Sequence, residues 1–252
     1  MTLLDAQKVT KSFGGIVALD AVSLAVGQSE IVGLVGPNGA GKTTLFNCLL
    51  GMLRPDGGRI TFDGTDLSRL PTHGRARLGI GRTFQRVELF AGLSVREHLL
   101  VAERVRGGRG GLLQDLLGRG GSRPAEMARA DDVLALLGIR DVADHAVEAL
   151  TLGQSRLVEI GRALIGEPRL LLLDEPSSGL DASETEALGA VLEDVRRERA
   201  TAILLVEHDL AMVRKVCERL YVLDFGSLLV EGECAEVLRD ERVITAYLGV
   251  SG

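Results

Sequence analysis

Apolar residues alternate with polar ones at the start of the chain. LDAVSLAV (19–26) has a period of two, EIVGLVG (30–36) is a short apolar run, and RITFDG (59–64) ends in an Asp-Gly pair. This pattern predicts β-strands joined by tight turns. One segment between them, TTLFNCLLGM (43–52), has the pattern of a helix that ends at Gly51.

The middle of the chain, from about Leu93 to Leu164, has helical periodicity instead. SVREHLLVAERV (94–105) begins with a serine that can cap a helix, and PAEMARADDVLALLGI (124–139) has apolar positions at helical spacing before a glycine stop. Residues 107–122, which lie between these segments, include seven glycines. Glycine loses much conformational entropy when it is ordered, so we expect a flexible surface connection there.

Strands and helices alternate again in the last third. RLLLLDEP (169–176) and TAILLVEHD (201–209) are apolar strands that each precede a helical segment, and YVLDFGSLLVEGE (221–233) has the pattern of a hairpin. Such alternation is typical of a mainly parallel sheet with helices on its faces. The pattern therefore predicts an α/β fold that carries a helical middle section.

Composition excludes several classes of protein. The 252 residues are 46% apolar, enough for a full core, and the net charge of −6 has the wrong sign for a nucleic-acid-binding sheath. Three cysteines without close spacing, Cys48, Cys217 and Cys234, fit neither a disulfide framework nor a zinc site and suit a reducing cytoplasm. We find no signal-peptide pattern and no apolar run near the ~20 residues that span a bilayer, so membrane involvement is expected to come through a partner.

A phosphate-binding motif follows the apolar run at 30–36. The glycines of this motif let backbone amides converge on one concavity, and the helix N-terminus behind it adds positive potential for phosphates. Lys42 can reach the β- and γ-phosphates, and the Thr43 hydroxyl can ligate Mg²⁺. The expected ligand is ATP. The residues expected to bind it, which fit G-x-x-x-x-G-K-[ST] and continue into the helix, are Gly36, Pro37, Asn38, Gly39, Ala40, Gly41, Lys42, Thr43 and Thr44.

Two carboxylates follow the apolar run Leu170–Leu173. Asp174 is placed to hold the metal, directly or through water, and Glu175 can polarise the attacking water. Taken alone, Glu175 fits a surface acid at the end of a strand equally well. Together with the phosphate-binding motif, the pair predicts a site of ATP hydrolysis.

The segment Leu150-Thr151-Leu152-Gly153-Gln154 heads a helical stretch between these two motifs. Here the chain resembles the ABC ATPase superfamily, whose signature reads LSGGQ at this place. The resemblance covers essentially the whole chain, because the motifs occur in the family's order. Thr151 replaces serine but keeps the hydroxyl, whereas Leu152 puts an apolar side chain where the family has glycine.

The resemblance implies roles for further residues. Phe13, in KSFGG, matches the aromatic residue that stacks on adenine, and Gln85, in RTFQ, matches the glutamine that links the metal and the water to the transporter interface. His208 matches the switch histidine that contacts the γ-phosphate, and Ser178–Asp181 matches the loop that crosses between subunits. Thr151, Gly153 and Gln154 would contact the ATP held by a second chain. The implied catalytic residues are Glu175, His208 and Gln85, and the implied metal ligands are Thr43, Gln85 and Asp174.

The same resemblance implies a fold and partners. The family fold has a P-loop NTPase core, with a mainly parallel sheet and an antiparallel β subdomain, and an inserted α-helical subdomain. We expect one domain over 1–252, with the core in 1–85 and 165–252 and the helical signature subdomain in 86–164. Two chains, as a homodimer or as a heterodimer with a second ABC ATPase, would sandwich ATP and Mg²⁺ between them. Integral-membrane permease subunits would hold the dimer at the cytoplasmic face of the inner membrane, with a solute-binding protein as an indirect partner and no nucleic acid.

Some segments of the chain also bear on which solute is transported. LPTHGRARLGIG (70–81), its continuation to Ala102, and RVITAYLG (242–249) look like the ATPases of branched-chain amino-acid importers. Importers of urea or short amides use close relatives of these ATPases, and the lipopolysaccharide-export ATPase shares the segment LPTHGRARLGIG. Uptake of urea or short amides and export of lipopolysaccharide therefore remain alternatives. Two other classes fit less well. A non-transport ABC protein usually joins two ATPase domains or carries a long coiled-coil insertion, and a small-molecule kinase needs neither the signature nor His208.

Overall fold

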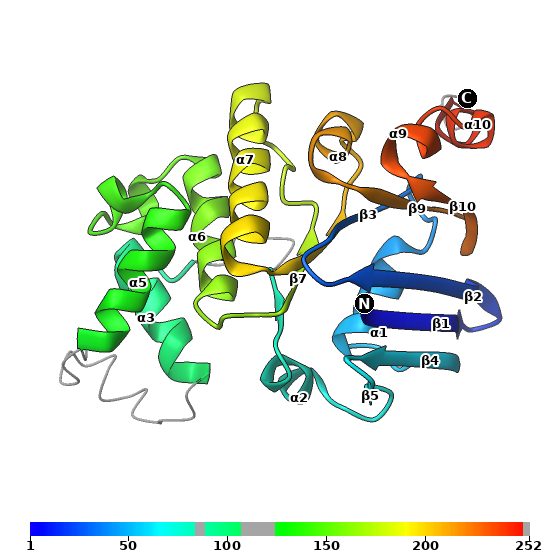
Figure 1. Ribbon diagram of the computed structural model, residues 1–252, viewed down its shortest axis with the longest axis horizontal. Helices are drawn as coiled ribbons and strands as arrows, with labels where there is room; N and C mark the ends of the chain where they lie inside the picture. The colour runs from blue at the N-terminus through cyan, green and yellow to red at the C-terminus, as the bar shows by residue number, and fades with distance from the viewer. Residues whose placement is uncertain (84–88, 107–123, 249–252) are drawn as a thin grey trace.

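The computed structural model describes residues 1–83, 89–106 and 124–248, and it contains two sheets with helices around them (Figure 1). Gln85 and the glycine-rich stretch 107–122 lie outside the described residues, so the predictions made for them stay predictions. The strands are β1 (Thr2–Phe13), β2 (Ile16–Gly27), β3 (Ile31–Val35), β4 (Gly57–Phe62), β5 (Thr65–Asp66), β6 (Ile80–Arg82), β7 (Leu170–Asp174), β8 (Ala202–Val206), β9 (Arg219–Asp224) and β10 (Ser227–Glu233). The helices are α1 (Lys42–Leu50), α2 (Thr72–Arg77), α3 (Val95–Arg106), α5 (Pro124–Leu136), α6 (Leu152–Leu164), α7 (Ala182–Arg199), α8 (Leu210–Val216), α9 (Cys234–Val237) and α10 (Glu241–Leu248), with short 3-10 turns at Arg140–Val142 and Val147–Ala149.

A six-stranded sheet forms the centre of the molecule, in the order β10-β9-β3-β8-β7-β6. The strands from β9 to β6 run parallel, and β10 pairs antiparallel with β9. All positions of β3, β7 and β8 are buried. Parallel strands covered on both faces need continuous apolar sequence, which explains why LLLLD and AILLV show no alternation.

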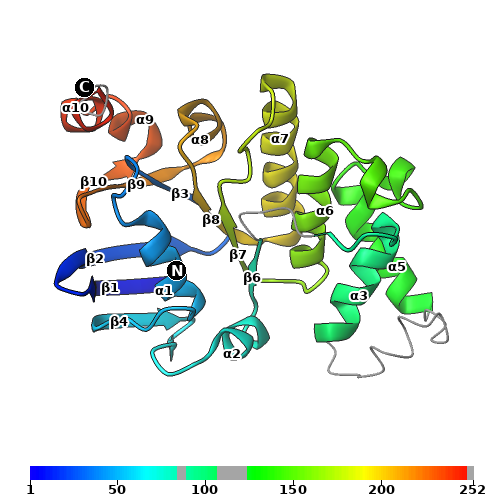
Figure 2. The ribbon, with the colours of Figure 1, turned by 180° about the vertical axis from the view of Figure 1, so that it is seen from behind.

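The two faces of this sheet pack against different layers. Ile31, Leu171 and Ile203 belong to the core shared with α7 and α8, whereas Val32 and Leu204 belong to the core shared with α1 and the second sheet. This division follows from the alternation of side chains along a strand. Figures 1 and 2 show α7 and α8 on one side of the central sheet and α1 between the two sheets.

The second sheet is antiparallel, in the order β2-β1-β4-β5. The predicted Asp-Gly turn is confirmed: Asp63 and Gly64 join β4 to β5 with φ of 48° and 75°, the conformation of a tight hairpin turn. Gly14 and Gly15 close the β1–β2 hairpin in the same way, with φ of 52° and 88°. The predicted α/β class, with a mainly parallel sheet and an antiparallel sheet, is confirmed.

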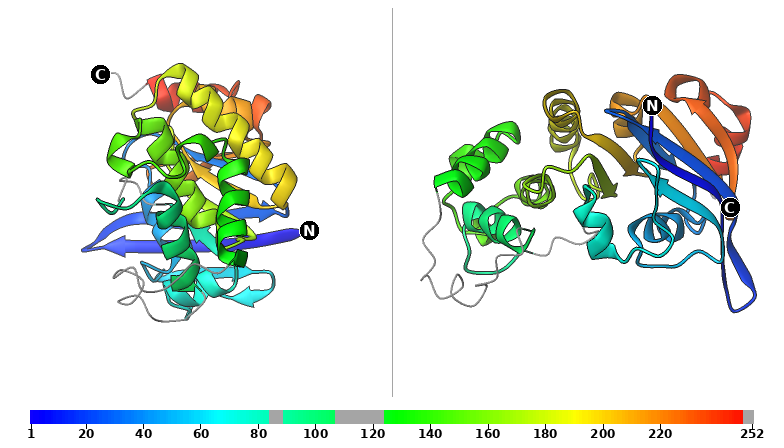
Figure 3. Two further views of the ribbon diagram at one scale, coloured as in Figure 1. Left: turned by 90° about the vertical axis from the view of Figure 1, so that its left-hand side faces the viewer. Right: turned by 60° about the horizontal axis from the view of Figure 1, so that its bottom comes forward.

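The helices α3, α5 and α6 gather at one end of the molecule, and Figure 3 shows them beside the sheets rather than on them. The predicted serine cap of α3 is confirmed, since the Glu97 N–H donates to Ser94 Oγ at 3.3 Å and the Ser94 N–H donates to Glu97 Oε2 at 2.7 Å. Gly161 lets these helices approach, because a Cβ there would lie 2.9 Å from Leu137 Cδ1.

Candidate nucleotide-binding site

The segment Gly36–Gly41, the phosphate loop below, turns the chain from β3 into α1. Gly36, Gly39 and Gly41 have φ of 146°, 81° and 100°, values that glycine adopts readily and other residues do not. A Cβ on Gly36 would lie 2.1 Å from the Leu223 carbonyl oxygen, so side chains are also excluded by space. A Cβ on Gly39 would meet nothing within 4 Å, which shows that the loop is open on that side.

The amides of this loop are available to a ligand. α1 has no side-chain cap at its N-terminus, and its first amides continue the row of loop amides. Unpaired amides at a helix N-terminus attract anions, so the loop fits phosphate groups. Within the described part of the chain, no protein acceptor is bonded to the N–H groups of Asn38, Gly39, Gly41, Lys42, Thr43 and Thr44.

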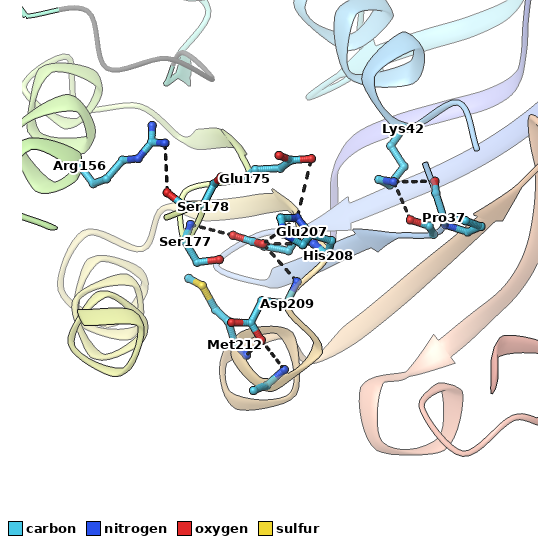
Figure 4. A network of polar contacts seen from close by, with 12 residues as sticks. Pro37, Lys42, Arg156, Glu175, Ser177, Ser178, Glu207, His208, Asp209 and Met212 are labelled. Atoms are coloured by element: carbon cyan, nitrogen blue, oxygen red, sulfur yellow. Dashed lines mark hydrogen bonds and ion pairs between the residues drawn. The ribbon is translucent and has the colours of Figure 1, made fainter. Parts of the chain in front are cut away.

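Lys42 is buried and folds back over the phosphate loop (Figure 4). Its Nζ donates to the carbonyl oxygens of Gly36 at 2.6 Å and Pro37 at 2.9 Å. Burial lowers the pKa of Lys42, and the charges of Glu175 and Asp174 act in the opposite direction. A phosphate would offer this cation a stronger acceptor than the two carbonyls do.

Asp174 and Glu175 follow one another at the carboxyl end of β7. Burial, then the negative charges of Glu175 and Glu207, raise the pKa of Asp174 to about 6, while Lys42 acts to lower it. Glu175 has a φ of 47°, which is strained for a residue with a side chain, and its N–H donates to the Val206 carbonyl at 2.8 Å. A carboxylate crowded by like charges fits a divalent cation, which would relieve the repulsion.

His208 lies next to this pair, at the carboxyl end of β8. Its Nδ1 is 3.9 Å from Glu175 Oε1 and 4.0 Å from Glu207 Oε2, and more than half of its side chain is exposed. Asp209 follows as the cap of α8, with its carboxylate accepting from the N–H groups of Ala211 and Met212. The structure therefore places His208 beside Glu175, and the predicted contact of His208 with a γ-phosphate stays a prediction.

Glu207 is a residue of this site that the sequence analysis missed. It is fully buried, and its carboxylate accepts from the Ser177 N–H at 2.9 Å and the His208 N–H at 3.2 Å. The signal was present, because an acid at the end of an apolar strand is also the pattern of Asp174. Glu207 ties the loop after β7 to the loop after β8. Figure 4 shows this network continuing through Ser178 to Arg156 on α6, whose Nη2 donates to the Ser178 carbonyl at 3.5 Å.

The signature residues begin α6 and lie apart from the phosphate loop. The Gln154 N–H donates to Thr151 Oγ1 at 3.2 Å and the Thr151 N–H donates to Gln154 Oε1 at 3.0 Å, which is a capping box. A Cβ on Gly153 would lie 2.9 Å from Glu184 Oε1 of α7, so Gly153 allows a close approach of the two helices. Leu152 is exposed. Among the described residues, no polar contact joins Thr151, Gly153 or Gln154 to the phosphate loop of the same chain.

Phe13 ends β1 and is 45% exposed, and Lys11 Nζ lies over its ring at 5.4 Å from the centroid. Its hairpin packs on the phosphate loop, since a Cβ on Gly41 would lie 2.6 Å from the Ala18 carbonyl oxygen of β2. The turn after β9 packs there as well, with the Gly226 N–H donating to the Ala40 carbonyl at 3.1 Å. The structure thus gathers the phosphate loop, Asp174, Glu175 and His208 at one edge of the central sheet, with the Phe13 hairpin beside the loop.

Comparison with known proteins decides the family. The model of the ABC transporter family matches residues 19–178, which include the phosphate loop, the signature and Glu175. The chain belongs to this family. This ABC-type ATPase is 40% identical over 250 residues to LivG of Salmonella typhimurium, a high-affinity branched-chain amino acid transport ATP-binding protein, with 98% of each chain covered. It is 36% identical to LptB of Haemophilus influenzae, a lipopolysaccharide export system ATP-binding protein, with 99% of this chain and 98% of that one covered.

Solved structures agree with this assignment. MJ1267, an ATP-binding cassette of an ABC transporter solved in its ADP conformation, superposes with a TM-score of 0.88 at 31% identity over 99% of both chains. The cassette MJ0796, solved as a dimer in a post-hydrolysis state with ADP and Pi, gives a TM-score of 0.76 at 26% identity over 92% of this chain and 99% of that one. No helix of this ATPase within 1–83, 89–106 or 124–248 is long and apolar enough to cross a bilayer.

Proposed function

We propose that this ATPase works as a dimer and powers the uptake of branched-chain amino acids through a separate membrane permease. The observation that carries the proposal is the 40% identity to LivG. It extends over 98% of both chains and therefore includes the helical segments as well as the phosphate loop. In this proposal, residues 86–164 act as the signature subdomain on a core made of 1–85 and 165–252.

The position of the signature residues in one chain supports the dimer. Thr151, Gly153 and Gln154 lie at an exposed helix start, apart from the phosphate loop of their own chain. The Thr151 hydroxyl accepts from Gln154 and keeps its own proton for donation, and the start of α6 adds positive potential. These groups suit the γ-phosphate of an ATP bound to a second chain. The dimeric form of MJ0796 also supports such an arrangement.

In this proposal, different residues of the chain bind the ATP and orient the attacking water. The amides of the phosphate loop and Lys42 hold the β- and γ-phosphates, and Phe13 stacks on the base. Thr43, Asp174 and Gln85 would hold Mg²⁺, which would supply positive charge to the phosphates. Glu175 accepts a hydrogen bond from the attacking water and orients it, and His208, less than 4 Å from Glu175, donates to the γ-phosphate.

A groove of about 670 Å³ between α2, β6, α3 and α6 is the proposed contact with the permease. Ile80, Val101 and Phe90 give it apolar surface, and Arg77 and Arg162 line it with positive charge. An apolar groove with basic residues fits a short amphipathic helix that carries acidic side chains. We assign it to such a helix of the permease.

Arg75 connects this groove to the nucleotide site. It is buried on α2, and its Nη1 donates to the carbonyl oxygens of Cys48 and Leu49 at 2.7 Å. These carbonyls end α1, the helix that begins at the phosphate loop, and a cation is favoured at that end of a helix. A movement of the permease helix would thereby reach α1 directly.

Lipopolysaccharide export is the second candidate function. It is supported by the 36% identity to LptB over 99% of this chain. Both functions use the same nucleotide site and differ only in the subunits that the ATPase serves. The experiment must therefore measure which solute controls hydrolysis in the assembled transporter.

The test uses the tagged chain, purified in detergent from its native membranes together with the subunits bound to it. ATP hydrolysis is measured with Mg²⁺, with the solute-binding fraction of the same cells, and with leucine, isoleucine, valine or lipopolysaccharide. A parallel preparation with Glu175→Gln corrects for contaminating ATPases. We expect stimulation by the three amino acids only. Stimulation by lipopolysaccharide alone would favour the second candidate, and a chain that brings down no membrane subunit would overturn the transport proposal.

A further inference from the structure

The C-terminal helix α10 contacts the phosphate loop through Tyr247. The Gly36 N–H donates to the Tyr247 hydroxyl oxygen at 2.9 Å, across 211 positions of sequence. Gly36 is a buried residue, and the Tyr247 hydroxyl is the acceptor that its N–H has in the described part of the chain. Tyr247 belongs to the RVITAYLG phrase, which lies outside the span 19–178 matched by the family model.

Gly36 is the shared partner of Tyr247 and Lys42. Its N–H donates to Tyr247, and its carbonyl oxygen accepts from Lys42 Nζ at 2.6 Å. One residue therefore separates the tyrosine hydroxyl from the cation that is aimed at the phosphates. The backbone of Gly36, with a φ of 146° and the Leu223 carbonyl against its α-carbon, has little freedom as long as these contacts hold.

The rest of α10 keeps Tyr247 in place. Val243, one turn earlier, is buried in the core that contains β3 and α8. The Tyr247 ring packs against the same core, and burial raises the pKa of its hydroxyl. The acceptor for Gly36 is thus a neutral hydroxyl on a fixed helix rather than a mobile surface group.

We propose that Tyr247 is a positioning residue for nucleotide binding, and that α10 is part of the nucleotide site. A buried N–H without an acceptor is unfavourable, so loss of the hydroxyl lets Gly36 leave the conformation that the phosphates need. Apparent affinity falls in proportion to the fraction of loops that stay competent. We expect the chemical step to be unaffected once ATP is bound, because in the described part of the chain no hydrogen bond joins Tyr247 to Glu175 or His208.

Tyr247→Phe removes only the hydroxyl, and the chain offers a matched control. It has two tyrosines, and the second, Tyr221, accepts from the Ala25 N–H at 3.1 Å in the contact between the sheets. We expect Tyr247→Phe to raise the ADP Kd and the ATP KM about five- to tenfold with kcat within about twofold, and Tyr221→Phe to leave all three within about twofold. An unchanged ADP Kd in Tyr247→Phe overturns the proposal, whether or not its melting temperature falls. A lower kcat with unchanged KM overturns it as well.

A spectroscopic readout tests the contact in a variant that keeps Tyr247. The chain has no tryptophan, so Tyr247 is the only tyrosine emitter of Tyr221→Phe. ADP should change this emission along the same saturation curve that calorimetry gives for ADP binding, and Lys42→Ala in the same background should abolish the change. Full ADP binding without any change in emission contradicts the proposal. Absence of ADP binding to the unaltered chain would instead refute the nucleotide site itself.

Discussion

Three acids crowd the carboxyl ends of β7 and β8. Asp174 and Glu207 are buried, and Glu175 joins them on a strained backbone. Burial and the neighbouring charges raise the pKa of Asp174 to about 6, and Lys42 offsets only part of this effect. In the free protein the negative charge of Asp174 is thus unfavourable. The proposed Mg²⁺ site explains its presence there, because a bound cation would offset that charge.

This arrangement makes stability depend on pH. The pKa of Asp174 is about 6 in the folded chain against an ordinary 3.8, so the folded state binds the proton more tightly than the unfolded state. Stability therefore falls as pH rises from about 4 to about 6 and stays lower above that range. Asn cannot ionise, so Asp174→Asn should raise the melting temperature at pH 8 by about 2–6 °C without nucleotide, and by less at pH 5. Thermal melts at the two pH values check this, and a lower melting temperature for Asp174→Asn at pH 8 would contradict it.

Sequence predicted the residues of this site where the signal is local. The phosphate loop is one contiguous motif, and the spacing of its residues is set by a single turn of the backbone. The residues from Gly36 to Thr44 could therefore be assigned from the sequence alone. Glu207 could have been assigned by the same signal as Asp174, because it follows an apolar strand, which the structure buries at every position. Tyr247 could not be assigned, because its contact with Gly36 joins residues 211 positions apart and exists only in the folded chain.

At the scale of elements, the site depends on β7 and β8 being neighbours. They pair in parallel from Leu170↔Ala202 to Asp174↔Val206, so the loops that follow them start side by side. Glu207 fastens these loops, since it accepts from Ser177 on one and from His208 on the other. The position of His208 relative to Glu175 follows from this connection.

Glu207→Gln tests the connection. The new amide nitrogen cannot accept a hydrogen bond, so at least one backbone N–H loses its partner at a cost of about 1–3 kcal/mol. We expect a lower melting temperature and a kcat reduced at least about tenfold, with the ATP KM within about twofold, because the phosphate loop is untouched. Steady-state kinetics measure both, and Glu186→Gln, which alters an exposed acid paired with Lys215, is the control. A kcat equal to that of the unaltered chain would show that Glu207 does not hold His208 in place.

Some elements were predicted from the sequence, and others were not. The helices α3, α5 and α6 have enough residues to show their period, and the five-residue strands β3, β7 and β8 were predicted from continuous apolar runs. α2 and β6 were missed because Thr72–Arg77 and Ile80–Arg82 are too short for a pattern to emerge. β6 is a strand because it pairs with β7, a partner about 90 positions later that no local signal reveals.

At the scale of the whole molecule, the proposed function divides each nucleotide site between two chains. The phosphate loop and the acids open at the edge of the central sheet, and the start of α6 is exposed beside the helices at the other end (Figures 1 and 3). The phosphate loop and the start of α6 both have hydrogen-bond donors that suit phosphate. The central claim of the proposed function is that two chains combine these two regions, so that each ATP is held by the phosphate loop of one and the signature of the other.

Mixing two inactive variants tests this claim most directly. Lys42→Ala should lose its phosphate site and keep its signature, whereas Gly153→Asp should keep its phosphate site and repel the γ-phosphate of its partner. Each variant alone should be nearly inactive. Random pairing makes half of the dimers mixed, and each mixed dimer has one composite site with two good halves, so an equal mixture should recover up to about a quarter of the ATPase activity of the unaltered chain. A mixture as inactive as its components, together with a specific activity of the unaltered chain that does not depend on protein concentration, would mean that each chain carries a complete site of its own.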